Sequence, residues 1–252
     1  MQAVLYVAHG SRVKAGVDEA IEFIETVKPK INVAIQEICF LELAAPSIVE
    51  GVAACVAKGA TNIAVVPILL LTANHAKQDI PLEMNKAKEL YPDVTFTFGR
   101  PFGIHEKLIE SLHERVLEKG VEQHDEIDIL LIGRGSSDPS VQIDLQQIAN
   151  HLQSRYHYSK VDICFLYGNG PSFEKALEQL KKERNNPVYI VPYLLFTGLL
   201  KIGIQKKIAQ QGFLENQVVL CDCLGYDENV RQVLIERVEE TLYSYGESVS
   251  NG

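Results

Sequence analysis

The sequence has no tryptophan, few cysteines and no long apolar run. None of the five cysteines belongs to a Cys-x-x-Cys pair, so zinc fingers and disulfide scaffolds are excluded and we expect reduced core thiols. The longest apolar stretch, residues 63–73, contains Pro67 and is shorter than the ~20 residues that a membrane-spanning helix needs. The first residues lack the basic segment and cleavage site of a signal peptide. We therefore expect a cytoplasmic protein with no membrane partner.

Positive charge is also scarce, with 24 Lys and Arg against 33 Asp and Glu and a net charge of −9 at pH 7. Broad attraction to nucleic acid or to an anionic membrane is therefore not expected. An anionic ligand would have to bind at a local group of basic residues. The 252 residues, 46% of them hydrophobic, are sufficient for one or two globular domains.

Several common enzyme motifs are absent. The sequence has no P-loop, no Gly-x-Ser-x-Gly elbow and no His-Glu-x-x-His motif, which removes the usual signals of nucleotide hydrolysis, α/β-hydrolase chemistry and zinc proteolysis. Gly133-Arg134-Gly135 and Gly168-Asn169-Gly170 resemble the start of a dinucleotide fingerprint, but both lack its third glycine. No nucleotide cofactor is predicted.

The sequence does contain an internal repeat at a constant offset, with residue 5 matching residue 130. Residues 5–11 match 130–136, residues 39–41 and 46–47 match 164–166 and 171–172, and residues 66–67 match 191–192. Three motifs that match without an insertion indicate a duplication. We predict two similar domains, residues 1–122 and 123–252, joined through the polar stretch 120–126.

Each half alternates short β-branched runs with amphipathic helical patterns. Strands are predicted over residues 3–8, 32–42, 62–70, 94–98, 128–133, 160–166, 187–195 and 217–221. Helices are predicted over residues 13–28, 46–58, 77–90, 105–119, 139–154, 171–183, 199–211 and 227–243. This alternation predicts the α/β class: two similar flavodoxin-like domains, each a four-stranded parallel sheet with helices on both faces.

Three residues able to bind metal follow successive strands of the first half: His9, Glu42 and His75. In a sheet of order 2-1-3 these strand ends meet at one edge, where ligands bind in such folds. Two imidazoles and a carboxylate suit a divalent first-row metal such as Fe²⁺ or Co²⁺ and leave positions open for substrate. The alternative for each residue taken alone is a hydrogen-bonded loop side chain.

The second half does not repeat this set. Arg134, Tyr167 and Leu200 stand at the positions that correspond to His9, Glu42 and His75. The framework is therefore duplicated and the ligands are not, which favours a metal site in the first half alone. The remaining histidines, His113 among them, are expected at the surface.

Hydroxyl and guanidinium groups follow the first strand of each half. They are Ser11 and Arg12 in the first half, and Arg134, Ser136 and Ser137 in the second. Helix N-termini and arginine side chains bind carboxylates, so a carboxylate-rich ligand would fit between the halves. The alternative is that the serines are helix caps and the arginines are solvated.

The same segments resemble the class II chelatases. The first half carries the resemblance in residues 7–12 (VAHGSR), 40–42 (FLE), 66–70 (VPILL) and 75–81 (HAKQDIP), and the second in residues 131–139 and 191–198. It covers nearly the whole chain. Within this family the sequence is most similar to the two-domain sirohydrochlorin ferrochelatases of siroheme synthesis, which are related to the sirohydrochlorin cobaltochelatases of anaerobic cobalamin synthesis.

The resemblance implies a bilobal fold with a tetrapyrrole in the cleft. His9 and His75 correspond to the metal-binding histidines of the family and Glu42 to the accompanying acidic residue, so these three would be catalytic. Residues 1–122 would be the metal-binding catalytic domain, and residues 123–252 a degenerate duplicate that completes the cleft.

The implied reaction is the insertion of Fe²⁺ into sirohydrochlorin with release of two protons. It needs no cofactor beyond the metal substrate, with Co²⁺ or Ni²⁺ as alternative metals. Arg12 and Arg134, with Lys77 and Lys201 as further candidates, would meet the substrate's carboxylates. A cobaltochelatase and a non-catalytic metal or tetrapyrrole carrier remain as alternatives, and we expect a monomer because two fused halves already supply both sides of the cleft.

Overall fold

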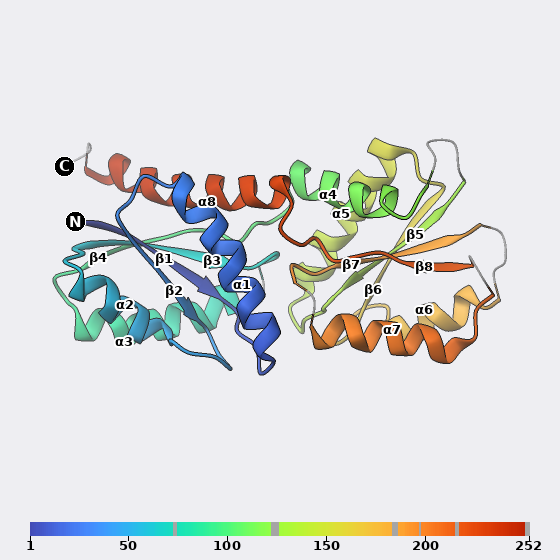
Figure 1. The fold of residues 1–252 in the computed structure, drawn as a ribbon, viewed down its shortest axis with the longest axis horizontal. Coiled ribbons are helices and arrows are strands. Elements are labelled where there is room, and N and C mark those ends of the chain that lie inside the picture. The colour runs from blue at the N-terminus through green and yellow to red at the C-terminus, as the bar shows by residue number, and fades with distance from the viewer. Residues whose placement is uncertain (73–74, 122–125, 183–185, 197, 215–216, 250–252) are drawn as a thin grey trace. The chain divides into compact units, whose positions relative to one another are not determined.

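The computed structural model of the chain describes residues 1–72, 75–121, 126–182, 186–196, 198–214 and 217–249 (Figure 1). These residues form two four-stranded parallel sheets, of order β2-β1-β3-β4 and β6-β5-β7-β8. The strands are β1 (Gln2–Ala8), β2 (Ile35–Phe40), β3 (Asn62–Ile68), β4 (Thr95–Phe98), β5 (Asp128–Gly133), β6 (Lys160–Phe165), β7 (Val188–Tyr193) and β8 (Val218–Leu220). The predicted fold class is confirmed, and both sheets have the 2-1-3 order on which the meeting of the strand ends depends.

The helices alternate with the strands as the sequence predicts. They are α1 (Lys14–Val27), α2 (Ile48–Ala57), α3 (Ile80–Leu90), α4 (Glu106–Leu117), α5 (Pro139–Tyr156), α6 (Phe173–Leu180), α7 (Leu199–Gln211) and α8 (Glu228–Val249). A short 3₁₀ turn, η1 (Lys28–Lys30), follows α1, and a π-helical turn, η2 (His75–Asp79), precedes α3. Asp138 caps α5 by accepting from the Ser140 N–H at 3.0 Å, and Pro139 occupies the first helical position, where its missing N–H has no partner to lose.

Both sheets are covered by helices on their two faces, which explains why their central strands are buried apolar runs. In the first sheet, Leu5 and Val7 pack with Val52 of α2 and Met84 of α3, while α1 and α8 lie over the other face (Figure 1). In the second sheet, the face of β5 and β7 that α6 and α7 cover forms a separate core. Helices α4 and α5 pack together, and α4 also packs on β7.

The compact units do not coincide with the predicted domains 1–122 and 123–252. One unit comprises Met1–Gly103 with Arg231–Gly252, and the other comprises Ile104–Val230. The two halves of the sequence therefore exchange their last helices: α4 belongs to the second sheet and α8 to the first. An amphipathic pattern shows that a helix covers a sheet but not which sheet, so the sequence could not predict this exchange.

A buried arginine fixes α8 to the first unit. Arg237 is 1% exposed, and its guanidinium donates to the carbonyls of Pro101 at 3.1 Å and Phe102 at 2.6 Å. It also pairs at 2.9 Å with Glu240, which accepts two further hydrogen bonds from the exposed Arg100. The backbone that leads out of β4 is thereby attached to α8.

Replacing Arg237 with Met is expected to lower the free energy of unfolding by about 3 kcal/mol, since two buried carbonyls and one carboxylate lose their donor. Arg100→Met is the control, because it removes a partner of the same Glu240 from an exposed site and is expected to cost less than about 1 kcal/mol. Urea unfolding of both variants measures the difference. Equal losses would show that burial does not strengthen the Arg237 contacts.

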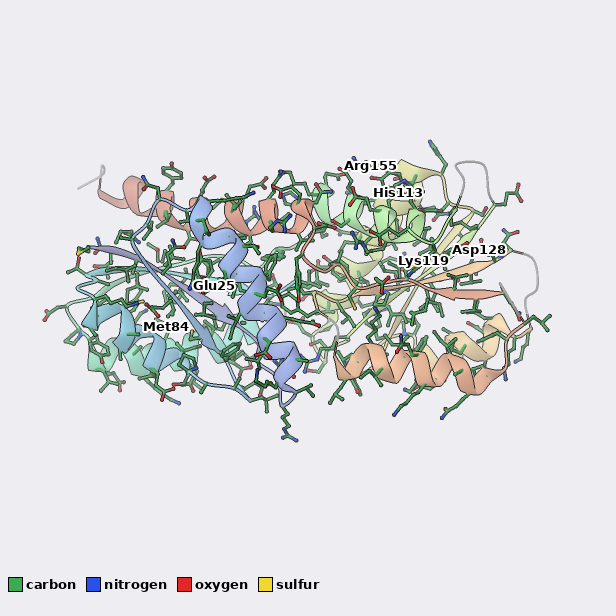
Figure 2. The ribbon with its side chains drawn as sticks, viewed as in Figure 1. Glu25, Met84, His113, Lys119, Asp128 and Arg155 are labelled. Atoms are coloured by element: carbon green, nitrogen blue, oxygen red, sulfur yellow. The ribbon has the colours of Figure 1, made fainter. Side chains whose placement is uncertain are left out.

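A histidine and two tyrosines attach the exchanged helix α4 to α5. The ring of His113 stacks on Tyr156 at 3.7 Å between centroids, and its Nδ1 lies 2.7 Å from the Tyr158 hydroxyl. The guanidinium of Arg155 lies over the ring of Tyr156. Figure 2 shows Arg155 near His113. His113, which was expected at the surface, is half-buried, because Tyr156 and Tyr158 cover part of its ring.

These surroundings predict a pH dependence of stability. Burial, and after it the positive charge of Arg155, lowers the pKa of His113. The neutral ring is favoured in the folded state, so stability is full above the unfolded pKa of about 6.5 and is lost as pH falls below it. We expect the thermal midpoint to fall between pH 7.5 and 5.5 more steeply for the native chain than for His113→Gln. If the thermal midpoints of the two proteins fell equally with pH, His113 would not be the source of the pH dependence.

All five cysteines are free and buried, as predicted. Burial raises the pKa of Cys55, Cys164 and Cys221 to about 12, which keeps these thiols protonated and unreactive. Among the helices of the described residues, none combines the length and the hydropathy that a membrane span requires.

Candidate functional site

His9 and Glu42 lie at the C-terminal edge of the first sheet. His9 directly follows β1, and Glu42 comes two residues after the end of β2, its neighbour in the sheet. The Leu41 N–H donates to the Ala8 carbonyl at 2.9 Å, and the Glu42 N–H donates to the His9 carbonyl at 3.1 Å. Backbone pairing therefore continues past the strands and brings the two side chains together.

A glycine makes this close approach possible. Gly10 has φ +94°, and a Cβ built on it would lie 1.8 Å from the Glu42 carbonyl oxygen. No other residue fits there, because the conformation is left-handed and the space is occupied by backbone. The close position of Glu42 therefore explains why a glycine follows His9.

The two side chains face each other. His9 Nε2 lies 3.5 Å from Glu42 Oε1, with the imidazole 22% and the carboxylate 44% exposed. His9 Nδ1 lies 3.3 Å from the Gly10 carbonyl, to which a proton on Nδ1 donates. In that tautomer Nε2 keeps its lone pair and points it at the carboxylate, an arrangement typical of metal-binding histidines.

Two acceptors that face each other need a cation between them. Ligands at about 2.1 Å from a four-coordinate ion are about 3.4 Å apart, which is close to the observed 3.5 Å between His9 and Glu42. The alternative cation is a proton, which would make the pair an ordinary ion pair of histidine and glutamate. The geometry is therefore suited to holding a small divalent ion without rearrangement.

His75, the third predicted ligand, begins the π-helical turn η2 after β3. Its backbone is described, but its side chain lies outside the described residues. Pro81 has no N–H to donate to the Lys77 carbonyl, so regular α-helical bonding cannot extend back over this turn. π-helical turns are frequent at functional sites. No group of three metal-binding side chains occurs among the residues with described side chains.

An acidic hollow of about 210 Å³ lies beside Glu42. It is lined by Leu41, Glu42, Asp79, Leu82 and Glu83. Asp79 and Glu83 are not among the site residues predicted from the sequence, although their spacing of four residues in the helical segment that follows β3 places them on one face. Their charge makes the potential around Glu42 more negative, which favours the approach of a cation.

The predicted anion-binding residues occupy matching places in the two halves. Ser11 Oγ accepts from the Val13 N–H and Ser136 Oγ from the Asp138 N–H, each at 3.0 Å. Both hydroxyls therefore stabilise the turn before a helix, as in the capping alternative, and each still has a proton to donate.

The basic candidates differ in how they are held. Arg12, Arg134 and Ser137 are exposed at the strand ends. Lys201 is instead bound to Asp222, which also accepts from Lys119 at 2.7 Å. These two cations, with Lys119 the stronger influence, lower the pKa of Asp222 to about 2. Asp222 thus neutralises part of the charge that Lys201 would offer to a carboxylate.

Comparison with known proteins agrees with this duplicated arrangement. The CbiX family matches the chain twice, over residues 3–119 and again over residues 128–241. The chain belongs to the CbiX family. This match confirms the family that the sequence resembles. The two matched segments correspond to the two halves of the sequence repeat and not to the two compact units.

The curated relatives of this chain include two ferrochelatases. The sirohydrochlorin ferrochelatase of Priestia megaterium is 45% identical over 98% of this chain and 92% of its own length, and that of Bacillus subtilis (strain 168) is 44% identical over 95% and 92%. The sirohydrochlorin cobaltochelatase of Priestia megaterium is 37% identical over 96% of this chain and 80% of its own.

Solved structures give the same result. SirB from Bacillus subtilis with Fe³⁺ has a TM-score of 0.89 and 43% identity, and covers 97% of both chains. The sirohydrochlorin chelatase SirB from Bacillus subtilis subspecies spizizenii in complex with cobalt has a TM-score of 0.85 and 39% identity, with the same coverage. Relatives that share the whole length of this chain thus include proteins solved with iron and with cobalt.

Proposed function

We propose that this chain is a metal chelatase that inserts Fe²⁺ into sirohydrochlorin, forming siroheme and releasing two protons. The observation that carries the proposal is the His9–Glu42 pair, whose Nε2 and Oε1 lie 3.5 Å apart, the separation of two ligands on one small ion. Ferrochelatases that are 44–45% identical over nearly the whole chain support both the reaction and its substrate.

In this proposal His9, His75 and Glu42 hold the incoming Fe²⁺. Three protein ligands leave coordination positions open, so pyrrole nitrogens can bind the ion before the protein releases it. The His9–Gly10 hydrogen bond keeps the Nε2 lone pair available for the metal. The exposure of both side chains gives the substrate access to the ion.

The two pyrrole N–H protons must leave as the metal enters. The Glu42 carboxylate lies 3.5 Å from His9 Nε2 and, at 44% exposure, can pass a proton to water. As a ligand it would remain ionised beside the cation, so it accepts a proton only as the metal departs. Its two roles therefore follow one another in time.

Residues at the strand ends of both halves are proposed to bind the substrate. Arg12, Arg134, Ser11, Ser136 and Ser137 meet the substrate's carboxylates and its edges. The reaction needs no cofactor besides the metal substrate, and the protein acts as a monomer in the cytoplasm. Charge-assisted contacts from arginine are the strong contributions expected from this set.

Cobalt is the second candidate metal, since a relative that is 37% identical is named a cobaltochelatase. A set of two histidines and one carboxylate does not select between Fe²⁺ and Co²⁺ by affinity alone. The higher identity to the two ferrochelatases favours iron.

The test is anaerobic turnover of sirohydrochlorin with Fe²⁺ or Co²⁺, followed by the visible spectrum. We expect many turnovers per chain, faster with Fe²⁺ than with Co²⁺. Faster turnover with Co²⁺ would favour the cobaltochelatase. Stoichiometric binding with no acceleration of insertion by either metal would contradict the enzyme and leave a carrier.

A further inference from the structure

The loop that follows β2 and the loop that follows β6 have the same backbone frame. In each loop the phenylalanine that ends the strand donates its N–H to the carbonyl of a proline six residues later, at 2.8 Å. Residue 43 of the first loop corresponds to residue 168 of the second. Both residues have positive φ, +62° at Leu43 and +75° at Gly168. The two loops therefore share one conformation at this position but place different residues in it.

Leucine is an unfavourable residue for this conformation. A left-handed φ brings the Cβ of an L residue close to backbone oxygen, whereas glycine adopts the conformation without strain. Among the described residues, His157 at the end of α5 is the one other non-glycine with positive φ. Leu43 directly follows Glu42, and strained residues are typical of functional sites. The strain at Leu43 therefore points to a role that glycine does not supply.

Gly168 lets the second loop close on the turn that follows β5. The Asn169 N–H donates to the Ser136 carbonyl at 3.2 Å, and the Asn169 side-chain amide donates to the Ser137 carbonyl at 3.4 Å. A Cβ built on Gly168 would lie 2.4 Å from the Ser136 carbonyl oxygen and 2.8 Å from the Ser136 nitrogen. Both are backbone atoms, which cannot turn aside as a side chain can. Only glycine therefore permits this closure.

Leu43 carries the Cβ that the closed second loop has no room for. The same closure in the first half would join the Ala44 N–H to the Ser11 carbonyl, and the Leu43 Cβ would then overlap the Ser11 backbone. Among the residues that the structure describes, no hydrogen bond joins Ala44 to Ser11. The Cβ of Leu43 therefore holds the first loop away from the turn that follows β1.

The open turn lies next to the His9–Glu42 pair. Ser11 comes two residues after His9. Ala44 comes two residues after Glu42, so the missing bond would tie together the two segments that carry the pair. We propose that Leu43 is a positioning residue, whose Cβ keeps these segments apart so that the metal ion can enter and leave the pair. This inference rests on the proposed function, in which the protein must release the ion to its substrate.

The test is the kinetics of Co²⁺ exchange in Leu43→Gly, with no tetrapyrrole present. Glycine removes both the strain and the Cβ, so the first loop can close as the second does. The rates of Co²⁺ uptake and release should both fall about fivefold, the effect of one added backbone hydrogen bond. Kd should stay unchanged, because closure affects the free and the metal-bound protein alike. Stopped-flow absorbance measures uptake, and a chase with excess EDTA measures release.

Leu43→Ala is the matched control, because alanine keeps the Cβ and removes only the rest of the side chain. It should exchange Co²⁺ at the native rates. Amide hydrogen exchange gives an independent readout, since the Ala44 N–H should exchange more slowly in Leu43→Gly than in Leu43→Ala or the native chain. The thermal midpoint of Leu43→Gly should be no lower than that of the native chain, because glycine is unstrained at φ +62°.

The outcomes separate this inference from the function on which it rests. If the native chain binds Co²⁺ and inserts iron while Leu43→Gly exchanges Co²⁺ at the native rates, the inference is overturned and the chelatase stands. Equally slow exchange in Leu43→Ala would also overturn it, because the Cβ would not be the part that acts. A native chain that neither binds Co²⁺ nor inserts iron would contradict the proposed function, and the inference would fail with it.

Discussion

Glu42→Gln is expected to lower kcat for iron insertion at least 100-fold. The amide keeps the size of the side chain but loses the negative charge that faces His9 Nε2, so it is a poorer ligand for Fe²⁺ and cannot accept a pyrrole proton. The variant should fold normally, since Glu42 is exposed and its backbone contacts are unchanged. Anaerobic turnover with Fe²⁺ measures the loss.

Glu89→Gln is the matched control for this substitution, because it makes the same chemical change at an exposed position on α3. It should insert iron at the native rate. A titration with Co²⁺ alone then separates the two roles of Glu42. A higher Kd for Co²⁺ in Glu42→Gln identifies a ligand, whereas an unchanged Kd with a low kcat identifies a proton acceptor. A kcat within twofold of the native value would contradict both roles.

Gly10→Ala is expected to lower the free energy of unfolding by about 4 kcal/mol. The new methyl group would overlap the Glu42 carbonyl oxygen, and φ +94° is strained for any L side chain. The turn can relieve the overlap only by moving Glu42 away from His9, so metal affinity should fall as well. Urea unfolding and a Co²⁺ titration measure the two effects.

Two other glycines serve as controls for Gly10→Ala. Gly135→Ala creates the same overlap in the second half, so it should be similarly destabilising but leave Co²⁺ affinity unchanged. Gly120 has φ +82° with nothing within 4 Å of a built Cβ, so Gly120→Ala isolates the conformational strain at about 1 kcal/mol. If Gly10→Ala were no less stable than Gly120→Ala, the close approach would not constrain the turn.

The strands, the helices and the duplication could be predicted from the sequence because each signal is local or repeated. Buried parallel strands are continuous apolar runs, and a repeat that carries Gly10 and Gly135 at corresponding positions implies the same turn twice. The nearness of His9 and Glu42 follows from the order of the strands, since β1 and β2 are neighbours and both residues follow their C-terminal ends.

Other features could not be predicted, because they depend on packing between distant segments. The apolar faces of α4 and α8 fit either sheet equally well as patterns, so their exchange and the stacking of His113 on Tyr156 were not evident. The burial of Arg237 depends on two carbonyls far from it in the sequence. An arginine on a helix is ordinarily a surface residue.

We infer that the strand ends of the first half hold the metal that is inserted. The measurement that tests it most directly is anaerobic iron insertion by the His9→Ala/His75→Ala double variant beside the native chain, with metal-free sirohydrochlorin as substrate. We expect the native chain to turn over many times and the double variant, folded to the same thermal midpoint, to fall to the spontaneous rate. Insertion by the double variant at close to the native rate would show that these histidines do not hold the inserted metal.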